Sequence, residues 1–141
     1  MAGERDLHEL LRQLRPEVAP GRYVFCSFPG RVPAGLRPVV TVAEPEGITA
    51  VVEQQEAEAL GLDYAYPAVW ITLRSLPQPS AGGTPMVRDE TGMAIATAVA
   101  GRLAEHGISC NVVAGFHHDH LFVAADHAER AVRVLERLAA G

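Results

Sequence analysis

Apolar positions along the chain repeat with two different periods, and the helical period marks both ends of the chain. Near the start, leucines recur three and four residues apart, which predicts an amphipathic helix with the stripe Leu7, Leu10, Leu11 and Leu14. The last segment repeats this spacing with Ala128, Ala131, Val132, Leu135 and Leu138. Both stretches contain a capping-box pattern, Asp6-x-x-Glu9 and Asp126-x-x-Glu129, so we expect the helices to begin there. Pro16 is expected to end the first one.

The first half also contains three runs that predict strands. Tyr23–Phe28 is aromatic and rich in residues that favour strands. Val39–Glu44 and Ile48–Glu53 predict a hairpin around a Pro-Glu-Gly turn. The polar run Gln54–Leu60 predicts a short helix that ends at Gly61, because glycine accepts the left-handed backbone that follows many helices.

The second half alternates strand and helix patterns. A strand over Ala68–Leu76 is followed by a helix over Thr91–His106 and by strands at Ile108–Gly115 and His120–Ala124. With the last helix the order is β-α-β-β-α, which lacks the closing strand of a ferredoxin-like β-α-β-β-α-β unit. An unpaired sheet edge needs a partner, and we expect Tyr23–Phe28 to supply it.

The strands of the second half carry apolar side chains on both faces. Trp70 and Ile71 are adjacent, and Leu121, Phe122 and Val123 run together, while successive strand residues point to opposite faces. The two helices cover one face, so the other needs the first half or a second copy of the chain. We therefore expect tight packing between the halves and a homodimer.

Composition narrows the classes of protein. The 141 residues include 48% hydrophobic residues and carry a net charge of −5, which is typical of a globular protein and argues against a nucleic-acid partner. No run approaches the ~20 apolar residues of a membrane helix, and the start lacks the pattern of a signal peptide, so we expect a cytoplasmic protein without a membrane partner. Cys26 and Cys110 lie in apolar runs and are expected to be buried, reduced thiols.

The histidine-rich segment HHDH, from His117 to His120, raises the question of a metal site. In an extended segment only His118 and His120 share a side, and no recognised metal spacing links them to another ligand. Asp119 is of a type favoured where a chain reverses. The pattern therefore favours a hairpin turn. There are two alternatives. The segment could be a turn that also contacts a ligand, or it could be a metal site.

Motifs for catalysis and for cofactors do not occur in the sequence. Ser27, Ser75 and Ser109 lack the G-x-S-x-G pattern, and Cys110 is expected to be an inert buried thiol. Neither G-x-G-x-x-G nor a P-loop is found. We therefore expect no catalytic residues, no cofactor and no enzyme activity.

The run GISCNVVAGFHHDHLFV, with the strand VWITL and the helix TGMAIATAVAGRLAEH before it, resembles a group of small bacterial proteins of paired ACT-like domains. LHELLRQLRPEVAPGRYVFCSF resembles the companion half of that group. The resemblance implies an α+β fold of ferredoxin-like βαββαβ units in tandem, with antiparallel sheets and helices on one face. Residues 1–66 would form the N-terminal ACT-like half and residues 67–141 the C-terminal ACT domain.

The resemblance also implies a ligand site. ACT domains commonly bind amino acids or other small effectors near the loop before their first helix, where a glycine lets the backbone approach the ligand. Gly92 matches that glycine, and the backbone N–H groups of Gly92, Met93 and Ala94 would donate hydrogen bonds to a carboxylate. Asn111 offers a donor and an acceptor, and His117 and His118 complete the predicted ligand-binding residues. Each has a structural alternative, such as a helix start at Gly92 or a sheet edge at Asn111.

One segment departs from the group. The relatives join the strand to the helix by a shorter loop, whereas Pro77–Glu90 is long and rich in proline and glycine. It would either cover the ligand site as a lid or extend into solvent. A regulatory protein that binds a small effector, an amino acid above all, is the function we expect. There are two alternatives. One is a dimeric module that binds a protein partner, and the other is a metal-dependent enzyme that uses HHDH.

Overall fold

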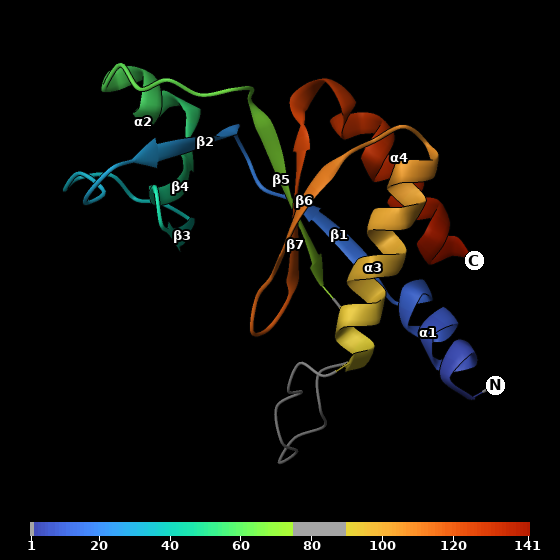
Figure 1. Cartoon of the computed structure of the whole chain (residues 1–141). Helices are drawn as coiled ribbons and strands as arrows, with labels where there is room; N and C mark the ends of the chain where they lie inside the picture. Colours follow the sequence, from blue (N-terminus) through green and yellow to red (C-terminus); the bar gives the residue numbers. More distant parts are fainter. Residues whose placement is uncertain (1, 75–89) are drawn as a thin grey trace, which may run out of the picture.

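The computed structural model describes residues 2–74 and 90–141, and the side chains of residues 7–74 and 94–141. Its helices and strands confirm most of the expected elements (Figure 1). In chain order they are α1 (Ala2–Arg12), β1 (Arg15–Val18), β2 (Tyr23–Phe28), β3 (Val40–Glu44), β4 (Gly47–Glu53), α2 (Gln54–Ala59), β5 (Ala68–Arg74), α3 (Glu90–Glu105), β6 (Cys110–Ala114), β7 (Asp119–Ala124), the 3-10 turn η1 (Ala125–His127) and α4 (Ala128–Ala140).

The strands form one antiparallel sheet in the order β3-β4-β2-β5-β7-β6, with β1 also paired to β5. The helices lie on one face of it. Tyr23 of β2 pairs with Ala68 of β5, so these two side chains point to the same face of the sheet. The residues that alternate with them point to the other face, where those of β2 contact α2 and those of β5 contact α3. This confirms the expected α+β fold of antiparallel ferredoxin-like units with helices on one face.

The closing strand of the second unit is β1. Its residues pair with β5 from Arg15 opposite Arg74 to Val18 opposite Ile71, which gives the order β1-β5-β7-β6. The expectation that Tyr23–Phe28 closes this unit was wrong, because β2 pairs with β5 only at its first residue, Tyr23. Pro16 was expected to end the first helix, but α1 already ends at Arg12 and Pro16 lies inside β1. A proline is tolerated there because β1 is short and pairs on one side.

The first unit has the same strand order, β3-β4-β2-β5. Its second helix is α2, but the stretch between β2 and β3 contains no helix in residues 29–39, which the structure describes. Strand β5 serves both units, since β2 pairs with its start and β7 with most of its length. The boundary at residues 66 and 67 stays a prediction, and the sheet itself crosses it.

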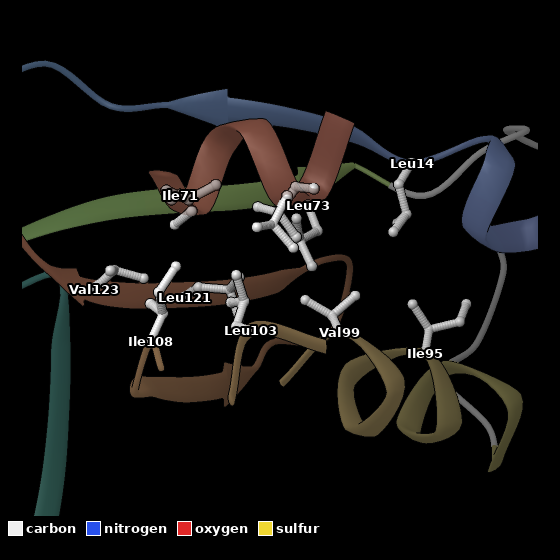
Figure 2. Close-up of a cluster of buried hydrophobic side chains, with 12 residues drawn as sticks. Leu14, Ile71, Leu73, Ile95, Val99, Leu103, Ile108, Leu121 and Val123 are labelled. Atoms are coloured by element: carbon white, nitrogen blue, oxygen red, sulfur yellow. The ribbon is translucent and has the colours of Figure 1, made fainter. Parts of the chain in front are cut away.

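The main core lies between the helices and β5 and β7 (Figure 2). Its fully buried side chains come from both halves of the sequence. Leu14 precedes β1, Ile71 and Leu73 belong to β5, and Val99 and Leu103 belong to α3. Burial of such side chains is the main source of stability in a domain of this size. The N-terminal segment is therefore part of the core of the second unit.

The face without helices carries an aromatic cluster, which we define as Tyr23, Phe25, Trp70 and Phe122. Phe122 is stacked on Trp70 at a centroid distance of 6.0 Å and meets Phe25 edge-on at 5.6 Å. Tyr23 and Phe122 are buried although no helix covers them, because strands of the first half bring apolar side chains onto this face. This confirms both the apolar character of the two faces and the tight packing between halves.

The capping boxes predicted the helix starts wrongly. Helix α1 begins at Ala2, before Asp6. Asp126 lies inside η1, and the residue that precedes α4 is His127, which makes no side-chain capping bond. The helix ends were predicted better. Gly61 and Gly107 follow α2 and α3 with φ of +65° and +73°, a conformation that favours glycine.

Cys26 and Cys110 are both free thiols, as expected. Cys26 is buried and Cys110 is half-buried, and burial raises the pKa of each thiol above its ordinary value. A raised pKa lowers the thiolate fraction at neutral pH, and the thiolate is the reactive form. In the part of the chain that the structure describes, none of the helices has the length and apolar character needed to cross a membrane.

Candidate functional site

Topology brings the start of α3 and the β6–β7 hairpin to the same end of the sheet. Strands β5 and β6 both run antiparallel to β7, so they are parallel to each other. Helix α3 connects the end of β5 to the start of β6, and it therefore begins at the end of the sheet where β5 stops and where β6 turns into β7 (Figure 1). Of the six predicted site residues, five lie at this end.

Gly92 lies in the first turn of α3, as the third residue of the helix. N–H groups in a first turn have no partner within the helix and favour an anion. Met93 and Ala94 follow as the fourth and fifth residues, and Ala94 is exposed. The loop Pro77–Glu90 lies outside the described residues apart from Glu90.

His117 and His118 lie in the hairpin between β6 and β7, which confirms that HHDH begins in a turn. The N–H of Gly115 donates to the carbonyl of His118 at 2.9 Å and closes this turn. The exposed ring of His117 packs edge-on against Phe116 at 5.0 Å. His118 is half-buried and lies near enough to Glu17 to lower the pKa of that carboxyl group.

Asn111 lies on the other face of the sheet. It pairs with Phe122 in the β6–β7 register, so its side chain shares the face of the aromatic cluster, opposite to α3. Its exposed amide Nδ2 lies 3.4 Å from the hydroxyl of Tyr66. The structure thus separates Asn111 from Gly92 within one copy of the chain, and a ligand contact of Asn111 stays a prediction.

An ion pair that the sequence did not reveal lies at the same end as the hairpin. The guanidinium of Arg74, the last residue of β5, donates to both carboxylate oxygens of Glu17 in β1. The hydrogen bond and the positive charge of Arg74 hold the pKa of Glu17 below its ordinary value, and His118 lowers it further. The two residues are distant in sequence, so only the pairing of β1 with β5 brings them together.

We expect Arg74→Gln to raise the pKa of Glu17 toward 4.5, its ordinary value, because the main stabilising cation is lost. Since the folded-state pKa of Glu17 is lowered, the pair stabilises the fold at neutral pH, and this contribution is lost as the pH falls through that pKa. An NMR titration of the Glu17 carboxyl carbon measures the shift. Arg102→Gln, which removes a similarly exposed arginine paired with Glu105, is the control and should leave the pKa of Glu17 unchanged.

His120 has a structural environment that sequence reasoning missed. Its Nδ1 lies 3.1 Å from the indole nitrogen of Trp70 and 3.1 Å from the hydroxyl of Thr72. The indole N–H is only a donor, so Nδ1 accepts and a neutral ring carries its proton on Nε2. The cross-strand pair of Thr72 and His120 explains the contact. In residues 7–74 and 94–141, no three His, Cys, Asp or Glu side chains are grouped to hold a metal ion.

Comparison with known proteins identifies related domains. Two models of the ACT domain match the chain in tandem, over residues 2–69 and 80–137. No protein with a curated description matches. The second match includes the first turn of α3 and the β6–β7 hairpin, and the first includes α1 and β1.

Solved structures with the same fold extend over nearly the whole chain. A Vibrio cholerae protein described as of unknown function and as a possible transport protein is 37% identical, with a TM-score of 0.81 over 97% of this chain and 98% of its own. An Agrobacterium tumefaciens protein is 21% identical, with a TM-score of 0.67 over 90% of each chain. One chain from a crystal structure of aspartokinase alpha and beta subunits is 12% identical, with a TM-score of 0.54 over 87% of this chain and 95% of its own. The last two show the fold alone.

Proposed function

The chain belongs to the ACT domain family, and from this premise we propose that it is a regulatory protein that binds an amino acid and has no catalysis of its own. ACT domains typically bind small effector molecules. The observation that carries the proposal is the position of Gly92 in the first turn of α3, inside the second ACT match and at the same end of the sheet as the β6–β7 hairpin.

In this proposal the backbone of α3 binds the carboxylate of the amino acid. The N–H group of Gly92, in the first turn, supplies a free hydrogen-bond donor, and the N–H groups of Met93 and Ala94 that follow it add to the positive end of the helix dipole. Gly92 has no side chain, so the ligand can approach the backbone closely. His117 and His118, on the neighbouring hairpin, supply groups that can contact the rest of the ligand.

We further propose that the protein works as a cytoplasmic homodimer. Strands β3 and β6 are the first and last strands of the order β3-β4-β2-β5-β7-β6, and each exposes an apolar side chain, Val42 and Val112. Unpaired edges with apolar residues favour pairing with another chain. Sedimentation velocity measures the mass in solution, and a monomer at all concentrations would remove this part of the proposal.

Thermal melts against the twenty amino acids test the binding proposal. We expect at least one of them to raise the melting temperature, because free ligand at 100 times its Kd adds about 2.7 kcal/mol of stability. Gly92→Leu is expected to weaken binding at least about tenfold, since a side chain there blocks the approach to the helix start.

Gly101→Leu is the matched control for that variant. Gly101 lies in the same helix, is exposed, and has no atom within 4 Å of the position that a Cβ would take. This variant should keep the affinity of the unmodified chain. Equal loss in both variants, or no melting shift with any amino acid, would contradict the proposal.

A further inference from the structure

Three arginines lie along one side of α4, beyond the site proposed above. Arg130, Arg133 and Arg137 are three and four residues apart, so their side chains are neighbours on the helix surface. All three are exposed, while Val134 between them is buried. The sequence alone suggests a solvated helix face here, because Glu129 and Glu136 alternate with the arginines.

The structure adds a pocket to this row of charges. A depression of about 280 Å³ is lined by Val134, by the three arginines and by His106, which follows the end of α3. The Nη2 of Arg130 donates to the carbonyl of His106 at 2.9 Å, which fixes that guanidinium at the rim. The Nδ1 of His106 donates to the carbonyl of Arg102 at 3.0 Å, and the other ring nitrogen, Nε2, keeps its own hydrogen-bonding capacity.

The arginines around the pocket share α4 with Glu129 and Glu136 but have no close carboxylate partner among the described residues. Among the residues described, no carboxylate lies within ion-pair distance of Arg130, Arg133 or Arg137. The ion pairs recorded in this part of the chain instead join Glu17 to Arg74 and Arg102 to Glu105. The chain as a whole carries a net charge of −5, so this cluster contrasts with the rest of the molecule. Like charges at this spacing on a helix repel each other, and a bound anion would relieve that repulsion.

We propose that this pocket binds the phosphate group of a small phosphorylated molecule. A phosphate monoester carries between one and two negative charges near neutral pH and three acceptor oxygens, which match several guanidinium groups better than a carboxylate does. Guanidinium groups bind such oxyanions through paired hydrogen bonds, and Val134 offers an apolar contact for the rest of the ligand. The pocket lies at the opposite end of α3 from Gly92, about 21 Å away along the helix axis, because His106 follows Gly92 by 14 residues.

Titration of the full chain with inorganic phosphate and with glycerol 3-phosphate, followed by amide NMR at constant ionic strength, tests this inference. We expect saturating shifts at His106 and along α4, with a Kd of about 1 mM or below for glycerol 3-phosphate, and weaker binding of acetate. Arg133→Gln with Arg137→Gln should weaken phosphate binding at least about tenfold. The same pair changed to lysine should also weaken it, because lysine keeps the charge but lacks the planar fork.

Arg22→Gln with Arg31→Gln removes the same charge from the first unit, at two exposed residues away from the pocket, and should leave binding unchanged. Shifts that grow linearly without saturation, or an equal loss in this control, would overturn the proposal. Tighter binding of a DNA duplex than of glycerol 3-phosphate at the same salt concentration would also overturn it. Because the readout is at α4, the result is independent of amino-acid binding near Gly92.

Discussion

Replacing Phe122 by alanine is expected to destabilise the fold by about 3–5 kcal/mol, the range for deleting a buried aromatic side chain. Phe122 is 0% exposed and lies at the centre of the aromatic cluster, with Trp70, Phe25 and Tyr23 at centroid distances of 6.0, 5.6 and 6.5 Å. Its removal leaves a cavity between strands of both units and deletes three ring contacts. Urea denaturation followed by the fluorescence of Trp70 measures the change.

Phe116→Ala is the control, because it makes the same chemical change in a neighbouring segment. The Phe116 side chain is 64% exposed in the β6–β7 turn, so the expected change is within about 0.5 kcal/mol. If Phe122→Ala were as mild as Phe116→Ala, the aromatic cluster would not hold the two units together. Because both variants make the same chemical change, the difference between their unfolding free energies measures the effect of burying the Phe122 side chain.

Periodicity predicted the elements of this fold well, but it could not predict their long-range partners. The short runs rich in apolar and β-branched residues in Ile108–Gly115 and His120–Ala124 identified β6 and β7, because each run is a local strand pattern. Strand β1 was missed because its four residues, RPEV, contain a proline and only one apolar β-branched residue. Its structure comes from pairing with β5, and no local pattern carries that information.

The site was predicted unevenly for a similar reason. The prediction put Gly92 near the start of a helix, and the structure has it in the first turn of α3, because the helical spacing of the apolar residues from Ile95 to Leu103 is a local pattern. Asn111 was grouped with it although the two lie on opposite faces of the sheet, since the register that decides the face of a strand residue depends on its partner strand. The contact of His120 with Trp70 and the pocket at Arg130 both depend on neighbours distant in sequence.

Leu14→Ala tests the assignment of the N-terminal segment to the second unit. Leu14 is 1% exposed and packs in the core with Ile71 and Leu73 of β5. Truncation of a buried leucine typically costs about 2–5 kcal/mol. We expect a loss in this range, measured by urea denaturation. We also expect faster amide hydrogen exchange in β5, α3 and α4 than in β2 and β4, because the cavity lies beneath the helices of the second unit.

Leu60→Ala supplies the matched comparison, since Leu60 is 55% exposed at the end of α2 and its truncation should change stability by about 0.5 kcal/mol or less. Two results would contradict the assignment. Equal effects of the two variants would mean that Leu14 is not a core residue. Faster exchange confined to β2 and β4 would mean that the segment from α1 to β1 belongs energetically to the first unit, although β1 pairs with β5.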